Sequence, residues 1–186
     1  MGSRAFVILS GLPASGKSTL ARGLARHLAL PVIDKDVILE SLYDSLGMGD
    51  HAWRGRLSRA SDEIVYAIAA DAGRAVLDNW WHHDSAPGRL RSLGGLLIEV
   101  HCDCDAALAA ERFLARTRHP GHLDPDLSPE EVAERVAAVR ARYPGPLGLG
   151  GPLLTVDTGR PVDSRAVAEQ VAQVLDAGAA PGSAGP

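Results

Sequence analysis

Residues 11–18 match the phosphate-binding motif G-x-x-x-x-G-K-[ST] at every fixed position. The apolar run 5–9 before the motif predicts a buried strand, and the helical spacing of apolar residues after it predicts a helix over 19–28. A glycine-rich turn between a strand and a helix directs successive backbone N–H groups at phosphate oxygens, and a helix N-terminus favours anions. The motif in this context predicts a loop that binds a nucleoside triphosphate.

Each residue of the loop has an expected part in holding the nucleotide. Lys17 reaches the β- and γ-phosphates, and the Ser18 hydroxyl coordinates Mg²⁺. Lys17 and Lys35 are the only lysines among the 19 Lys and Arg residues of the chain. One of the two therefore occupies the lysine position of the motif. We therefore expect ATP and Mg²⁺ as ligands, with the loop contacts made by Gly11, Ala14, Ser15, Gly16, Lys17, Ser18 and Thr19.

Length and charge limit the remaining possibilities. A chain of 186 residues that is 46% hydrophobic predicts one domain, which we place at 1–177. A formal net charge of -4 argues against a nucleic-acid partner held by a broad basic surface. Cys102 and Cys104 have no second pair, so we expect reduced thiols rather than a zinc site or disulfides. Without a signal segment or a long apolar run, we expect a cytoplasmic protein with no membrane partner; the sequence leaves the oligomeric state open.

Strands and helices alternate along the chain, which favours a three-layer α/β fold with a parallel sheet. Further strands are expected at 30–33, 75–78, 96–102 and 152–157, and further helices at 37–43, 58–74, 106–117, 128–143 and 164–175. Ser128 and Glu131 have the spacing of a capping box at the start of one of these helices. The tail 178–186 contains only Gly, Ala, Pro and Ser, and we expect it to be disordered.

Two segments beyond the loop carry a resemblance to known kinases. Residues 36–40 have the form D-x-h-h-E, where h is apolar, and residues 104–116 have the form C-D-x₆-R-x₃-R. The chain resembles the small P-loop kinases similar to chloramphenicol phosphotransferase and zeta toxin, an AAA-type ATPase-like group, and more distantly gluconate and shikimate kinases. The resemblance covers most of 5–175 and implies a five-stranded P-loop NTPase sheet of order 2-3-1-4-5 with a helical lid. The stretch 46–92, where this family binds its acceptor, is similar to no one member, so no acceptor is implied.

Three carboxylates follow the expected second and third strands. A hydroxyl that attacks a γ-phosphate needs a carboxylate to accept its proton, and the resemblance places the catalytic aspartate at Asp36. The alternative is that Asp36 only caps the helix that follows it. Asp34 is held in reserve as a water-mediated Mg²⁺ contact. Asp78 has the position of a Walker-B carboxylate for Mg²⁺ or the acceptor, and its alternative is a turn aspartate beside Asn79.

Arginines open a segment rich in proline and glycine, which we interpret as a lid at 116–127. A closing lid brings guanidinium groups to the transferring phosphoryl and excludes water. We expect Arg116 to be catalytic and Arg112 to bind the nucleotide, although Arg112 could instead be an exposed helix arginine paired with a carboxylate. The resemblance implies one more lid arginine, and its position in the family corresponds to Arg118 or His119 here.

The remaining candidates lie near the expected acceptor and adenine sites. Trp80 is assigned to the acceptor together with Asp34, Asp36 and Asp78, and core packing is the alternative for each tryptophan of this stretch. The adjacent His82 and His83 point in opposite directions, so they do not predict a shared metal. Thr158 follows the fifth strand, where such kinases pass the adenine. Glu99 lies within an apolar strand and is expected to be a paired structural carboxylate.

Two classes of function fit these residues. The first is a kinase that transfers the γ-phosphate of ATP to a hydroxyl of a small molecule, and the second is a P-loop ATPase or nucleotide-binding regulator. The second class usually follows its Walker-B aspartate with a glutamate that activates water, whereas Asn79 follows Asp78 here. The kinase is therefore favoured, with an antibiotic, a sugar or another metabolite as its acceptor.

Overall fold

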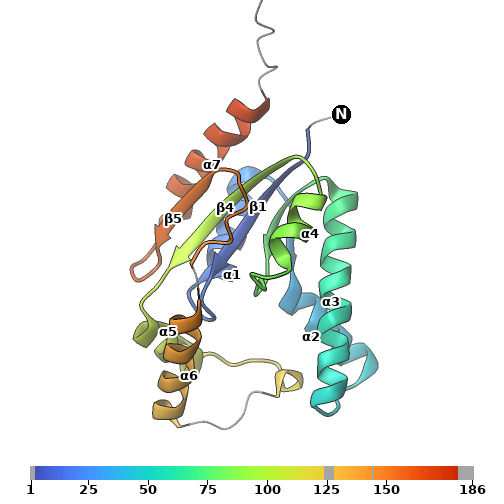
Figure 1. Ribbon diagram of the computed structural model, residues 1–186, viewed down its shortest axis with the longest axis vertical. Helices are drawn as coiled ribbons and strands as arrows, with labels where there is room; N and C mark the ends of the chain where they lie inside the picture. Colours follow the sequence, from blue (N-terminus) through green and yellow to red (C-terminus); the bar gives the residue numbers. More distant parts are fainter. Residues whose placement is uncertain (1–2, 124–127, 144, 180–186) are drawn as a thin grey trace, which may run out of the picture.

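The computed structural model of the chain describes residues 3–123, 128–143 and 145–179. A single five-stranded parallel sheet has the order β2-β3-β1-β4-β5 (Figure 1). This is the order implied by the resemblance, and it confirms the α/β P-loop kinase fold. The strands are β1 (Ala5–Gly11), β2 (Val32–Asp34), β3 (Arg74–Asp78), β4 (Leu96–Asp103) and β5 (Leu153–Asp157).

Helices cover both faces of the sheet. Alternate β1 side chains point to opposite faces, so Phe6 and Ile8 pack in one core cluster with α3 and α4, while Val7 and Leu9 pack in another with α1 and α7. Helices α5 and α6 form a smaller cluster of their own beyond the sheet (Figure 1). The helices are α1 (Lys17–Leu28), α2 (Lys35–Leu46), α3 (His51–Ala72), α4 (Ala86–Ser92), α5 (Ala106–Ala115), α6 (Pro129–Arg142) and α7 (Ser164–Ala179).

The start of α3 differs most from expectation. The sequence predicted a helix from Ser58, but α3 begins at His51, where the Asp50 side chain caps it by accepting from the Trp53 N–H at 2.8 Å. Residues 54–59 are mostly charged or polar and include Gly55, so this turn has little apolar periodicity. Two more turns of helix therefore pack against α2 than the sequence predicted.

The other differences between the predicted and the observed elements are smaller. Helix α4 was not predicted, and α5 ends at Ala115 rather than at residue 117. Helix α7 continues to Ala179, so residues 178–179 are helical rather than disordered, while 180–186 lie outside the described residues. Residues 124–127 of the expected lid also lie outside them. In the described part of the chain, no helix has the length and apolarity needed to cross a membrane.

Candidate active site

The phosphate loop joins β1 to α1 and has the backbone that its glycines predict. Gly11 and Gly16 have φ of 136° and 97°, and Ala14 has φ of 60°, which is uncommon for a residue with a side chain. A Cβ at Gly11 would lie 2.5 Å from the Cys102 carbonyl oxygen, so only glycine fits there. Gly16 has no side chain to cap α1, and the N–H groups of its first turn are therefore available to an anion.

Lys17 is folded back onto its own loop. Its Nζ donates to the carbonyl oxygens of Gly11 at 3.0 Å and Leu12 at 2.7 Å, and burial lowers its pKa. The same Nζ lies 5.9 Å from the centre of the Trp80 ring. The charge of Lys17 is therefore balanced by the carbonyl dipoles of its own loop.

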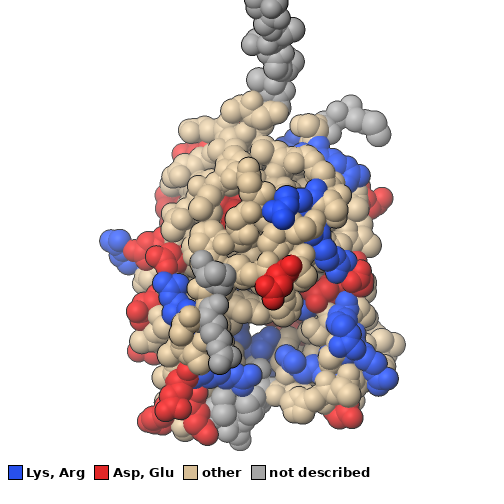
Figure 2. Space-filling view, viewed as in Figure 1, with Lys and Arg blue, Asp and Glu red and all other residues tan. Residues whose placement is uncertain are grey.

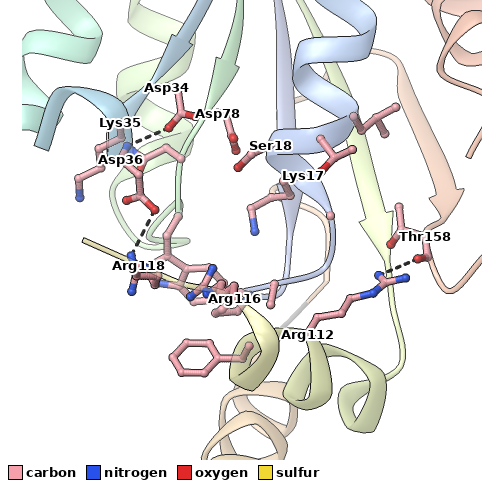
Figure 3. A pocket seen from close by; sticks show the side chains of 18 of the residues that line it. Lys17, Ser18, Asp34, Lys35, Asp36, Asp78, Arg112, Arg116, Arg118 and Thr158 are labelled. Carbon is pink, nitrogen blue, oxygen red and sulfur yellow. Dashed lines mark hydrogen bonds and ion pairs between the residues drawn. The ribbon is translucent and has the colours of Figure 1, made fainter. Parts of the chain in front are cut away.

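The ends of β2 and β3 bring two carboxylates together. Asp34 and Asp78 are register partners, and Asp78 is buried with its carboxylate next to the Ser18 side chain (Figure 3). Burial, with Asp78 close by, raises the pKa of Asp34 to about 6; burial also raises the pKa of Asp78. Asp78 is thus a buried strand-end carboxylate beside the loop, not a surface turn aspartate.

The N-cap residue of α2 is Asp34, not Asp36. The Asp34 carboxylate accepts from the Asp36 N–H at 2.9 Å and from the Val37 N–H at 3.5 Å. Because the helix starts at Lys35, Asp36 lies in its first turn, and the alternative role of Asp36 as the cap is wrong. The side chain of Asp36 is 54% exposed and lies at the cavity.

The described start of the lid segment packs against α2. Arg118 donates to the Asp36 carboxylate at 3.3 Å (Figure 3). It also lies 2.8 Å from Nδ1 of His122, whose Nε2 is 2.9 Å from Glu40. The His119 ring stacks on Tyr43 with a centroid distance of 5.4 Å. Arg118 therefore faces the cavity, while His119 contacts the C-terminal half of α2.

Arg112 lies in the last turn of α5, and Arg116 is the C-cap of this helix. Arg112 donates to the Thr158 carbonyl oxygen at 2.8 Å, and within residues 3–123, 128–143 and 145–179 it does not have the carboxylate partner of the alternative. The Thr158 hydroxyl in turn donates to the Asp103 carbonyl oxygen at 2.8 Å. Arg116 lies 4.5 Å from the centre of the Phe113 ring and lines the cavity.

A cavity of about 910 Å³ joins these groups, and basic side chains surround its opening (Figure 2). It brings together nearly all of the residues that the sequence singled out. Gly11 and Ser15 do not line it; both are loop residues that are buried. The candidate residues on its wall are Ala14, Gly16, Lys17, Ser18, Thr19, Asp34, Asp36, Asp78, Trp80, Arg112, Arg116, Arg118 and Thr158.

Sequence reasoning missed several residues on this wall, among them Lys35, Arg54 and Ser58. Arg54 and Ser58 are four residues apart and share a face of α3, a helical signal hidden by placing the start of this helix too late. Lys35 was noticed only as the second lysine. Its Nζ donates to Ser58 Oγ at 3.0 Å and to Asp62 at 3.1 Å.

The adjacent tryptophans have different environments. Trp80 is 36% exposed at the cavity and stacks on Tyr143 with a centroid distance of 5.8 Å. Trp81 is buried, and its Nε1 donates to the Leu9 carbonyl oxygen at 2.8 Å. Trp53 packs with the buried residues between α2 and α3. Core packing thus accounts for Trp81 and Trp53 but not for Trp80.

Glu99 is a buried carboxylate with partners. It accepts from the Ser10 hydroxyl at 2.5 Å and from the Leu147 N–H at 2.7 Å. Both donors belong to neighbouring elements, and the bonds offset the cost of burying the charge. These contacts agree with the expectation that Glu99 is a paired structural carboxylate.

Comparisons with known proteins agree with this geometry. The family model described as "AAA domain" matches residues 6–144. The shikimate kinase of Mycobacterium tuberculosis is 31% identical over 159 residues, covering 82% of this chain and 84% of its own.

Among solved structures, a candidate kinase from Chloroflexus aurantiacus is 34% identical with a TM-score of 0.80, over 92% of this chain and 98% of its own. The shikimate kinase of Acinetobacter baumannii has the same fold, with a TM-score of 0.61 at 15% identity and 96% coverage of both chains. These matches and the sheet order agree, and the chain belongs to the AAA domain family of P-loop kinase-like proteins.

Proposed function

We propose that the protein is an ATP-dependent kinase that transfers the γ-phosphate to a hydroxyl of a small molecule. The observation that carries the proposal is that one cavity holds both the phosphate loop and the Asp36 carboxylate, with arginines of the lid segment between them. Its volume of about 910 Å³ is at the upper end of ordinary ligand sites, which suits a nucleotide with a second small molecule.

The proposed mechanism gives a role to each charged residue at the reacting end of the cavity. As the acceptor oxygen bonds to the γ-phosphorus, its proton passes to Asp36, and the bond to the β-phosphate oxygen breaks to release ADP. Lys17 and Arg116 stabilise the charge that spreads over the transferring phosphoryl group. Arg118 donates to the Asp36 carboxylate and orients it before the acceptor arrives.

Magnesium fits the oxygen donors present. The Ser18 hydroxyl and the Asp78 carboxylate adjoin each other at the end of β3, and hydroxyl and carboxylate oxygens are ligands that Mg²⁺ prefers. Among residues 3–123, 128–143 and 145–179, no three His, Cys, Asp or Glu side chains form a metal site by themselves. We propose that Ser18 binds the ion directly and that Asp78 binds its water ligands, with ATP phosphates completing its shell. Bound there, Mg²⁺ would neutralise phosphate charge.

The competing ATPase function needs a base for water next to Asp78. The residue there, Asn79, donates its amide to Asp62 at 3.0 Å and has no basic group. The deciding experiment screens hydroxylated antibiotics, sugars and other metabolites with ATP and measures ADP release above the rate without acceptor. We expect one class to raise the rate strongly in the wild type but not in Asp36→Asn. ATP hydrolysis that no acceptor increases would contradict the kinase proposal.

A further inference from the structure

One arginine on the cavity wall has no carboxylate partner among the described residues. Arg54, in the first turns of α3, lines the cavity, and its Nε is shielded from solvent without a hydrogen-bond partner in the part of the chain that the structure describes. No Asp or Glu oxygen of these residues lies within 4.0 Å of its guanidinium. A half-buried cation of this kind attracts an anion strongly, because little water screens it.

Two acidic groups of α2 and α3 are engaged with other cations. Asp62 accepts from Lys35 at 3.1 Å and from Asn79 at 3.0 Å. Asp36 accepts from Arg118 at 3.3 Å. The charge of Lys35 is therefore balanced inside the protein, while that of Arg54 is directed to the cavity.

The position of Arg54 separates it from the nucleotide. Helix α3 packs on α2 in a cluster that includes Leu39 and Leu57, at the β2 edge of the sheet. Thr158, expected at the adenine, follows β5 at the opposite edge, and the phosphate loop follows β1 between them. Nucleotide bound from Thr158 to the loop leaves the α2–α3 side of the cavity, with Arg54 and Asp36, for the acceptor.

We propose that the acceptor carries an anionic group, a carboxylate or a phosphate, which Arg54 binds while a hydroxyl of the same molecule faces Asp36. The inference rests on the proposed kinase function. The planar guanidinium presents a fork of N–H donors that matches both groups. A charge-assisted contact of this kind changes affinity by about ten- to a hundredfold.

The test uses pairs of compounds that differ in one charge: gluconate with glucitol, shikimate with its methyl ester, and glucose 6-phosphate with glucose. We expect the wild type to favour an anionic member by about tenfold or more in kcat/KM. Arg54→Ala should lose this preference through KM, and Arg54→Lys should retain part of it. Arg59→Ala is the control, since Arg59 is exposed on the same helix and does not line the cavity. The preferred pair also distinguishes a carboxylate from a phosphate.

Two kinetic results would overturn the inference. One is an equal kcat/KM for the charged and neutral members of every pair that is phosphorylated. The other is a loss of kcat in Arg54→Ala that is the same for both members, because Arg54 would then act on the phosphoryl group that both reactions share.

A binding measurement keeps the inference testable if no compound is phosphorylated, which would count against the kinase proposal alone. In protein saturated with Mg²⁺ and a non-hydrolysable ATP analogue, the Arg54 Nε–H resonance can be assigned by its loss in Arg54→Lys. Titration with inorganic phosphate should shift this resonance, and titration with glucose should not. An unchanged resonance at saturating phosphate would refute an anion site at Arg54.

Discussion

Asp34→Asn should stabilise the nucleotide-free protein at neutral pH, although it removes an ion pair. Asparagine caps helices about as well as aspartate, so α2 keeps its first turn. The lost partner, Arg22, lies 3.4 Å away but its side chain is 60% exposed, and such pairs contribute little. What the substitution removes is a carboxylate charge held in a buried position beside Asp78.

The magnitude follows from the pKa of Asp34, which rises from 3.8 to about 6 in the folded protein. A pKa difference of about 2 corresponds to about 3 kcal/mol, and solvent in the cavity reduces this to about 1–2 kcal/mol. The folded protein binds the Asp34 proton more tightly than the unfolded chain does. The contribution of this group to stability is therefore lost as pH rises from about 4 to about 6, and the penalty is constant above that window.

Urea unfolding of the two proteins from pH 4 to pH 8 measures this effect. The advantage of Asp34→Asn should be small near pH 4, grow until about pH 6 and then level off. Asp71→Asn, at an exposed position on α3, is the control and should show no such growth. A stability difference that does not change with pH, or a less stable variant at pH 8, would refute the argument.

Three further predictions concern turnover. Lys17→Ala should fold and lose at least ~10²-fold in rate, because a cation is removed from a dry site; nearly unchanged turnover would exclude the phosphate role of Lys17. Asp36→Asn should reduce kcat by ~10² to 10⁴-fold with little effect on ATP affinity, and a larger loss in Asp34→Asn would identify Asp34 as the base instead. Arg116→Ala should lower kcat with little change in ATP binding; rapid hydrolysis without acceptor that this variant leaves intact would favour an ATPase.

The sequence was sufficient for most of the fold because its signals are local. A phosphate loop between an apolar strand and a helix, and alternating strands and helices, determine the fold class. The start of α3 was missed because this turn contains few apolar residues and its cap, Asp50, is recognisable only from the bond to Trp53. Helix α4 is short and contains Pro87 and Gly88, so its composition resembles a loop.

The site was predictable where residues are adjacent in sequence and unpredictable where contacts are distant. Lys17 and Ser18 follow from the motif alone. The pairing of Arg118 with Asp36 spans 82 residues, and nothing in a single sequence shows which lid arginine reaches α2. Arg54 was missed because Asp62 pairs with Lys35 and leaves Arg54 without a carboxylate partner among the described residues. This pairing depends on how α2 and α3 pack.

The pair of adjacent tryptophans after β3 gives the protein a built-in optical probe. The Trp80 indole lies near Nζ of Lys17 and stacks on Tyr143, so its fluorescence depends on where the lysine charge stands. Trp81 is buried with its N–H bonded to β1, and its emission should stay constant as an internal reference. When nucleotide draws Lys17 away from its own loop, Trp80 should report the event in the unlabelled protein, and the binding of ATP can be followed in real time before any phosphate is transferred.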